Sequence, residues 1–123
     1  MTTKSQQFGQ KSESLAVDCL KKNGYKIIQQ NYRTKLGEID IIAKQGKSLV
    51  FIEVKARKSD RFGRPEMAVT PKKQRKISMT ALYYLKSTKQ SNIKARFDVV
   101  AIKSTSNGPD IKIIKNAFEL AYT

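Results

Sequence analysis

The sequence contains no histidine and only one cysteine, Cys19. The missing histidines exclude His-based nucleophile triads, His-ligated zinc and most transition-metal sites. A single cysteine excludes an internal disulfide and a Cys-rich zinc site, and it suits the reducing conditions of the cytoplasm. Cys19 lies in the middle of an apolar stripe at helical spacing, which favours a small core residue over a reactive thiol.

Long apolar runs are also absent. The longest, Leu49–Ile52 and Ala81–Leu85, are far too short to span a bilayer. The first ten residues, MTTKSQQFGQ, contain no apolar segment that resembles a secretion signal. We therefore expect a cytoplasmic protein that does not enter a membrane. At 123 residues the chain can bury one core but not two, so residues 1–123 should form a single domain.

Acidic residues are scarce, with ten Asp and Glu against 25 Lys and Arg, which gives a formal net charge of +15. A domain this basic attracts polyanions, and nucleic acid is the commonest polyanion in a cell. No basic amphipathic helix with an aromatic face supports the alternative of an anionic membrane surface. The remaining alternative is a basic protein with a solvated surface. We expect a nucleic-acid partner.

Hydrophobic periodicity predicts the order α-β-β-β-α-β-β, a mixed α/β arrangement with a central five-stranded sheet flanked by helices. Turn-forming residues separate these elements. Residues Ser12–Lys22 are predicted as the core of a first helix, a second helix runs from Thr70-Pro71 to about Lys86, and a short helix covers Asn116–Tyr122. The predicted strands are Tyr25–Tyr32, Glu38–Ala43, Leu49–Ala56, Arg96–Lys103 and Ile111–Lys115. An exposed loop is predicted over Arg57–Glu66 and a turn over Ser104–Asp110.

Two of the few acidic residues, Asp40 and Glu53, lie inside half-buried strands, where a carboxylate is costly unless a positive group compensates it. Side chains alternate along a strand, so Asp40 shares a face with Glu38, and Glu53 shares a face with Lys55. Asp is also a poor strand former, which makes its position in mid-strand unusual. The question is whether a neighbouring side chain or a metal ion compensates these acids.

The turn between the two strands decides how close Asp40 and Glu53 come. If Gly46-Lys47 forms a two-residue turn, Asp40 falls directly opposite Glu53, and their Cβ atoms are about 5 Å apart. A turn on Gln45-Gly46 instead makes them diagonal neighbours on one face. Only an odd loop or a bulge would separate them.

Two carboxylates this close repel each other, so one should hold a proton unless a cation intervenes. Mg²⁺ prefers oxygen ligands and needs only one or two carboxylates, so we predict Asp40 and Glu53 as its ligands, with Mn²⁺ as a substitute. Lys55 would then contact a phosphate oxygen or assist the attacking water of a phosphodiester cleavage. The competing interpretation is a surface salt-bridge cluster, because Glu and Lys often alternate in strands.

Four motifs carry a family resemblance: GEIDIIA, VFIEVKAR, RFGRPEMAV and RFDVVAI. In this order, over Phe8 to about Phe118, they resemble the YraN-like family of bacterial proteins. That family is placed in the restriction-endonuclease-like PD-(D/E)xK superfamily, close to archaeal Holliday-junction resolvases. The resemblance implies a restriction-endonuclease-like fold, a DNA substrate, and catalytic roles for Glu13, Asp40, Glu53 and Lys55.

The sequence departs from the family pattern at two places. Ser12 stands where the family usually has glycine before the helical glutamate, and Ile39 takes the position of the proline in the superfamily's name. Glu13 lies at the edge of the apolar helical stripe, where it either reaches the sheet or remains an exposed glutamate favoured by the helix dipole.

Two further polar residues are candidates for supporting roles. Glu38 is either a second support for the metal site or a solvated charge. Gln74 lies on the inward stripe of the second predicted helix, where its amide needs a partner. It either orients water or phosphate near the site or bonds to the backbone.

Basic residues concentrate in the loop after Lys55 and at the start of the second predicted helix. We predict that they grip phosphates without reading sequence, although a solvated face is the simpler alternative. No recognition helix, zinc finger or RNA stacking platform is present, so we expect selection of nucleic-acid structure or ends. The residues are Arg57, Lys58, Arg61, Arg64, Lys72, Lys73, Arg75 and Lys76.

Two functions remain in competition. The first is a Mg²⁺-dependent endonuclease that cuts branched, flapped or junction DNA, and the second is a non-catalytic, basic accessory protein that binds nucleic acid. Met79, Leu82 and Tyr83 lie off the inward face of the second helix, where they either bury under other elements or form a dimer contact. A homodimer is expected only by analogy with junction resolvases.

Overall fold

The computed structural model describes residues 4–58, 69–90 and 92–120, with side chains from residue 11 onward. Within these residues the chain forms two helices and five strands in the predicted order α-β-β-β-α-β-β. The elements are α1 (Lys4–Lys22), β1 (Lys26–Thr34), β2 (Gly37–Gln45), β3 (Ser48–Arg57), α2 (Pro71–Ser87), β4 (Lys94–Thr105) and β5 (Gly108–Phe118).

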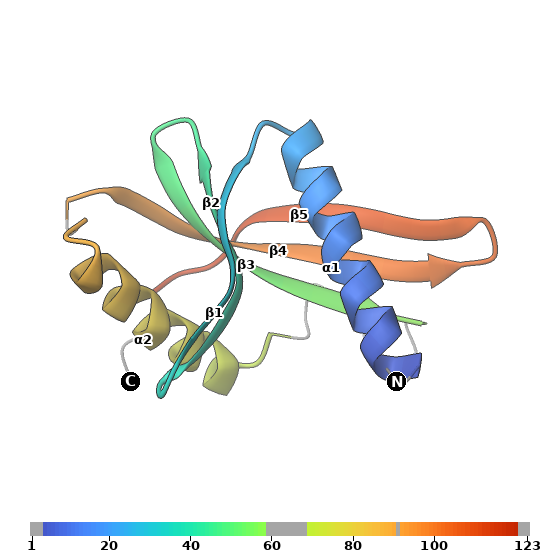
Figure 1. The fold of residues 1–123 in the computed structure, drawn as a ribbon, viewed down its shortest axis with the longest axis horizontal. Helices are drawn as coiled ribbons and strands as arrows, with labels where there is room; N and C mark the ends of the chain where they lie inside the picture. The colour runs from blue at the N-terminus through green and yellow to red at the C-terminus, as the bar shows by residue number, and fades with distance from the viewer. Residues whose placement is uncertain (1–3, 59–68, 91, 121–123) are drawn as a thin grey trace.

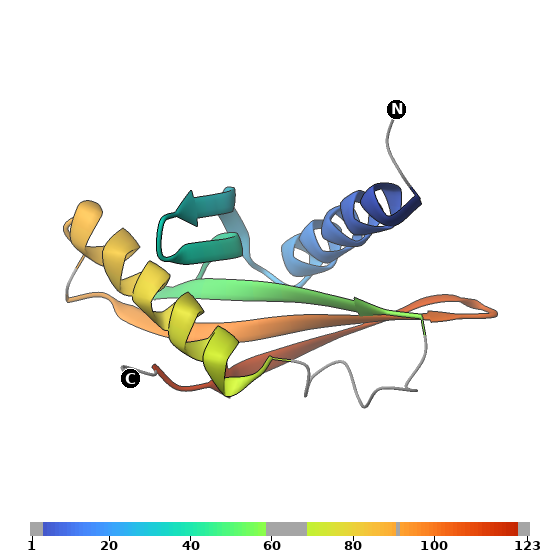
Figure 2. The same cartoon turned by 90° about the horizontal axis from the view of Figure 1, so that it is seen from below.

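The five strands form one mixed sheet in the order β1-β2-β3-β4-β5. β3 and β4 run parallel, and the other neighbours are antiparallel. Parallel neighbours need a crossover connection, and α2 supplies it between β3 and β4. In Figure 1 the β1–β2 hairpin crosses in front of β3–β5, with α1 on one side and α2 on the other. Figure 2 shows α1 and this hairpin above the layer formed by β3–β5.

The apolar core has two parts, one under each helix. Successive residues of β3 belong alternately to the two parts: Val50 and Ile52 pack with α1, whereas Leu49 and Phe51 pack with α2. Because alternate side chains of a strand point to opposite faces, the two helices cover opposite faces of the twisted sheet. Glu53 continues the series of Leu49 and Phe51, so the sheet presents this carboxylate to α2.

The β2–β3 hairpin has the register that a Gly46-Lys47 turn predicts. Gln45 pairs with Ser48, and the ladder continues to Ile41 opposite Ile52. Gly46 adopts a φ of 59°, a left-handed conformation that glycine tolerates without a steric penalty. One further step along this register sets Asp40 opposite Glu53.

The predicted helix over Asn116–Tyr122 is wrong for its described residues, 116–120, and its last two residues lie outside the described part of the chain. β5 continues to Phe118, which pairs with Phe97 across a register shift. The shift occurs at Asn116, which has a φ of 51° and donates its backbone N–H to Asp98 Oδ1 at 3.1 Å. A bulge held by a distant carboxylate therefore extends the strand where local sequence favoured a helix.

Several element boundaries also differ from prediction. α1 contains the predicted helix core over Ser12–Lys22 and extends back to Lys4. The predicted turn over Ser104–Asp110 is shorter in the structure, because β4 ends at Thr105 and β5 begins at Gly108. Arg57 belongs to the end of β3, and residues 59–68 of the predicted loop lie outside the described residues. Neither of the two described helices has the length and apolarity needed to cross a membrane.

Candidate active site

Asp40 and Glu53 meet where β2 separates from β3. The backbone ladder between the strands ends at the pair Ile41 and Ile52. Just beyond it, Asp40 Oδ2 accepts a hydrogen bond from the backbone N–H of Val54 at 2.8 Å. This hydrogen bond fixes the aspartate beside Glu53, as the two-residue turn predicted.

Glu53 is a buried carboxylate with two ammonium neighbours. It is only 5% exposed, and its Oε1 lies 2.8 Å from Lys73 Nζ and 3.8 Å from Lys55 Nζ. Lys55 comes from the same strand, whereas Lys73 reaches across from the first turn of α2. Lys55 is therefore where the sequence predicts it, and Lys73 is an additional partner.

The closeness of the charges changes the protonation of the cluster. Burial raises the pKa of Asp40 from 3.8 to about 7, and the negative charge of Glu53 adds to this effect, while the hydrogen bond from Val54 opposes it. Asp40 therefore gains and loses its proton near neutral pH. The expected repulsion between the two acids is present in the structure.

The two lysines respond in opposite directions. Burial lowers the pKa of Lys55, and the hydrogen bond and positive charge of Lys73 lower it further. For Lys73, burial lowers the pKa, but the hydrogen bond and charge of Glu53 outweigh it and raise the pKa overall. Lys73 thus carries the charge that neutralises Glu53, and Lys55 is the lysine that gives up a proton more readily.

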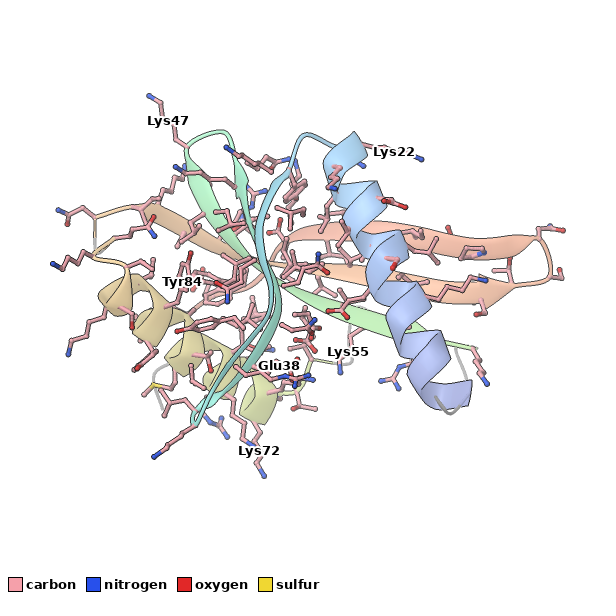
Figure 3. All side chains as sticks on the ribbon, viewed as in Figure 1. Lys22, Glu38, Lys47, Lys55, Lys72 and Tyr84 are labelled. Carbon is pink, nitrogen blue, oxygen red and sulfur yellow. The ribbon has the colours of Figure 1, made fainter. Side chains whose placement is uncertain are left out.

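A cleft of about 400 Å³ opens on the two carboxylates. Its walls come from the start of β2, from β3 and from the first turns of α2, and Figure 3 shows Glu38, Lys55 and Lys72 around this region. The lining residues are Gly37, Glu38, Asp40, Glu53, Thr70, Lys72, Lys73, Lys76 and Ile77. The cleft therefore combines acidic groups on its sheet side with basic groups on its helix side.

Local features of the sequence set the walls of the cleft. Thr70 caps α2, since its hydroxyl oxygen accepts from the Lys73 backbone N–H at 3.2 Å, and Pro71 occupies the first turn. Gly37 lets β2 approach α2 closely, because a Cβ there would lie 3.0 Å from Thr80 Oγ1. This approach brings the start of β2 and the carboxylates under the first turns of α2.

Glu13 is not among the residues that line this cleft. It lies on the stripe of α1 that includes the buried Ala16 and Leu20, and its Oε1 is buried without a hydrogen-bond partner in the part of the chain that the structure describes. A buried carboxylate oxygen without a donor is unusual. The catalytic role of Glu13 stays a prediction.

The predicted supporting residues differ in position. Glu38 lines the cleft, forms an ion pair with Arg33 at 3.3 Å, and helps to raise the pKa of Asp40. Gln74 instead donates from Nε2 to the backbone oxygen of Val69 at 3.0 Å. Its amide thus holds the segment that leads into α2, which was the simpler of its two predicted roles.

The predicted phosphate-binding residues divide into groups. Lys72, Lys73 and Lys76 all line the cleft, and Lys73 also forms an ion pair with Glu53. Lys73 precedes the inward-facing Ile77 and Ala81 by four and eight residues, and this helical spacing was the signal in the sequence that Lys73 faces the sheet. Arg57 ends β3 and helps to lower the pKa of Lys55, and Arg75 and Lys58 do not line the cleft. Arg61 and Arg64 lie outside the described residues.

The donor set of the cleft fits a divalent ion that prefers oxygen. Residues 4–58, 69–90 and 92–120 contain no cluster of three or more His, Cys, Asp or Glu side chains arranged to hold a metal. Asp40 and Glu53 each keep a second carboxylate oxygen besides those bound to Val54 and Lys73. Because Mg²⁺ needs only one or two carboxylates and takes its other ligands from water and phosphate, these two residues suffice.

The sequence matches one family model and many known proteins. Residues 12–102 match the model of the uncharacterised protein family UPF0102. The chain is 48% identical over 120 residues to a UPF0102 protein of Syntrophus aciditrophicus, covering 98% of this chain and 94% of that protein. It is 48% identical over 122 residues to a UPF0102 protein of Geobacter metallireducens, covering 99% of this chain and 100% of that protein. A UPF0102 protein of Caldicellulosiruptor saccharolyticus is 46% identical to it over 114 residues, covering 91% of this chain and 97% of that protein.

Proposed function

We propose, on the premise that this chain belongs to the uncharacterised protein family UPF0102, that it is a Mg²⁺-dependent endonuclease acting on branched, flapped or junction DNA. The YraN-like resemblance agrees with this family, and the relation to the PD-(D/E)xK nucleases and resolvases is part of the proposal. One observation carries it: Asp40 and Glu53 converge beside Lys55 in a cleft whose opposite wall is basic.

Asp40 and Glu53 are the residues that would hold the metal ion. When bound, Mg²⁺ would supply positive charge that makes the attacking water more acidic and offsets charge in the transition state. The hydrogen bond from Val54 orients Asp40, and burial together with the negative charge of Glu53 raises the pKa of Asp40 to about 7, although Lys73 lowers it in part. A divalent cation would offset that negative charge.

Lys55 is the residue that would handle the proton of the attacking water. Its pKa is lowered by burial and by Lys73, so a larger share of it is neutral than for an exposed lysine. It also lies on the same face as Glu53, with its Nζ 3.8 Å from that carboxylate. Lys73, by contrast, neutralises Glu53 and holds α2 against the sheet.

Lys72 and Lys76 would bind the phosphates that flank the cut. Both line the cleft on its α2 side and both are exposed. The net charge of +15 would attract the polyanion, and contacts of this kind position a backbone without selecting sequence.

The ion pair between Lys73 and Glu53 favours a second candidate function. Because Lys73 already lies 2.8 Å from Glu53, the cluster is partly neutralised by the protein itself. A chain that binds nucleic acid as an accessory protein, without cutting it, would need no more than this. The two candidates differ in whether Asp40 and Lys55 are needed for turnover.

A cleavage assay separates the two candidates. The full chain is incubated with junctions, flaps, single strands and duplexes, with Mg²⁺, Mn²⁺ or EDTA, beside the variants Asp40→Asn and Lys55→Met. The matched controls are Asp110→Asn and Lys47→Met, which remove the same charges at exposed positions outside the cleft. Metal-dependent cleavage that falls about 100-fold or more in the first two variants alone supports the nuclease. Binding without cleavage of any substrate supports the accessory protein.

A further inference from the structure

A second hollow, of about 550 Å³, lies between the β1–β2 turn and the outer face of α2. Its lining contains two aromatic rings and two cationic side chains, and it contains no acidic residue. We call it the tyrosine groove. The residues that line it are Tyr32, Arg33, Thr34, Lys35, Leu36 and Tyr83.

The tyrosine groove exposes apolar surface to an unusual degree. Tyr83 is 51% exposed and Leu36 is 44% exposed, and Met79, one turn before Tyr83 on α2, is 40% exposed. Of the two alternatives for these side chains, burial under other elements is therefore excluded for Met79 and Tyr83, and a contact between copies of the chain stays a prediction. Large apolar side chains gathered at one exposed place usually mark a binding surface.

The aromatic side chains of the groove are held on rigid elements. Tyr32 packs edge-on against Tyr84, with ring centroids 5.2 Å apart, and Tyr84 is itself buried in the core under α2. Tyr83 is the next residue of the same helix and points outward, with half of its surface exposed. Its ring can therefore stack on a ligand while the backbone beneath it stays fixed.

The groove lies next to the candidate active site along the chain. The neighbouring residues Leu36 and Gly37 line the groove and the cleft respectively. On α2, the spacings of four and seven residues place Lys72, Lys76 and Tyr83 along one stripe. Lys76 and Tyr83 are about 10 Å apart along the helix axis, which matches the length of roughly three stacked nucleotides.

The charges around the groove indicate the kind of ligand. Arg33 and Lys35 belong to its lining, and Lys72 and Lys76 line the neighbouring cleft. The acid next to it, Glu38, is already paired with Arg33 at 3.3 Å. A ligand that brings both flat apolar groups and regularly spaced negative charges fits this surface, and a single-stranded nucleic acid has both.

We propose that the tyrosine groove binds an unpaired nucleotide, whose base stacks on Tyr83 while its phosphates contact the neighbouring cations. Bases in a continuous duplex are already stacked on each other and cannot occupy such a groove. The groove would thus favour substrates with a single-stranded segment close to the cut, such as flaps. This selection of substrate rests on the proposed nuclease function, whereas the binding of the base does not.

The test measures binding of the full chain in EDTA, so that cleavage plays no part. The ligands are a single-stranded oligothymidine, an abasic oligonucleotide with the same number of phosphates, and a blunt duplex. The variants are Tyr83→Ala, Tyr83→Phe, Lys76→Met, and Ile28→Ala, an exposed apolar control on β1 outside the groove.

We expect Tyr83→Ala to weaken binding of the oligothymidine about tenfold, because one stacked base is lost. The slope of log affinity against log salt should stay unchanged, and Tyr83→Phe should bind as the wild type does. Lys76→Met should instead reduce that slope on all three ligands, since it removes a phosphate contact. Ile28→Ala should change nothing, and Tyr83→Ala should not affect the abasic strand or the duplex.

Three results would overturn the proposal. Tyr83→Ala could leave binding of the oligothymidine unchanged, or it could weaken the abasic strand and the duplex equally. It could also convert a dimer into a monomer in light scattering, which would make the groove a contact between copies of the chain. If base-dependent binding persists but no substrate is ever cut, only the proposed nuclease function fails.

Discussion

Asp40 and Asp98 lie on different strands of one sheet, and their carboxylates are bound in different ways. Asp98, on β4, is fully buried and accepts hydrogen bonds from the Tyr25 hydroxyl at 2.7 Å, from Arg96 Nε at 3.0 Å and from the Asn116 backbone at 3.1 Å. Asp40, on β2, accepts one backbone hydrogen bond and faces the like charge of Glu53.

The difference separates a buried acid that the protein's own donors satisfy from a half-buried acid that faces a cleft. Protein donors satisfy Asp98, and the network that it forms ties the segment before β1 to β4 and β5. Burial and then the hydrogen bond to Asp98 raise the pKa of Tyr25 to about 12, so its hydroxyl remains a donor at any physiological pH. Asp40 has a raised pKa, accepts a hydrogen bond from Val54 and faces a cleft, which is a pattern typical of candidate functional sites.

The largest effect should come from Asp98→Ala. This change leaves the charge of Arg96 and the hydroxyl of Tyr25 without their acceptor, so we expect a loss of about 3–5 kcal/mol in the free energy of unfolding. Urea denaturation measures it. The control Asp110→Ala, at an exposed position of β5, should stay within about 0.5 kcal/mol of wild type. A loss of similar size in both variants would remove the distinction between the buried network and an ordinary surface acid.

The second effect depends on pH and concerns Asp40. The pKa of Asp40 is about 7 in the folded state, above the ordinary 3.8, so the folded state binds a proton more tightly than the unfolded state does. The free energy of unfolding therefore has its full value below about pH 4, and it falls as the pH rises to 7. Asp40→Asn avoids this loss. The variant should therefore gain stability over wild type as pH rises from 4 to 7, reaching about 1–3 kcal/mol at pH 8.

Denaturation curves at pH 5 and pH 8 check this prediction, with Asp110→Asn as the control. Addition of Mg²⁺ at pH 8 should narrow the gap between wild type and Asp40→Asn, because the ion binds only the folded wild-type carboxylates. A difference in unfolding free energy between the two proteins that does not change with pH would mean that the pKa of Asp40 is not raised in the folded state.

The third effect concerns competition for Glu53. Lys73 occupies Glu53 Oε1, so Lys73→Met should free this oxygen and increase the affinity for Mn²⁺ about fivefold to tenfold in the absence of nucleic acid. Lys86→Met, which removes the same charge at an exposed position near the end of α2, is the control. Weaker binding of Mn²⁺ by Lys73→Met would show that the lysine supports the site rather than competing for it.

The smallest effect should come from Glu38→Gln. Its ion pair with Arg33 is largely exposed, with side-chain exposures of 41% and 72%, so the free energy of unfolding should change by no more than about 0.5 kcal/mol. The pKa of Asp40 should fall slightly, since the charge of Glu38 helps to raise it. NMR titration of the Asp40 carboxyl group measures this shift. A rise in that pKa would mean that Glu38 does not act on Asp40 through its charge.

The sequence was sufficient for the parts of the structure that depend on local pattern. Alternation in the strands and the Gly46-Lys47 turn predicted the register that places Asp40 beside Glu53, and the order of the elements followed from periodicity. The bulge at Asn116 was not predictable in this way, because it depends on Asp98, which lies on another strand.

The partners of the candidate site depend on how the helices pack, and this was harder to infer. The contact of Lys73 with Glu53 arises only when α2 folds back across the sheet after β3. The helical spacing of Lys73 with Ile77 indicated an inward direction, but not which residue it would meet. For Glu13, the sequence indicated the edge of the apolar stripe of α1, where it either reaches the sheet or stays exposed, and the structure adds an oxygen that is buried without a donor among the described residues.

Calorimetric titration of Mn²⁺ at pH 8 tests whether Asp40 and Glu53 together form a metal site. The full chain is titrated with an uncleavable phosphorothioate oligonucleotide present, beside the double variant Asp40→Asn, Glu53→Gln. We predict saturable uptake of metal by the wild type and none by the double variant. Equal uptake by both proteins, or no uptake by the wild type, would contradict a metal site formed by these two carboxylates.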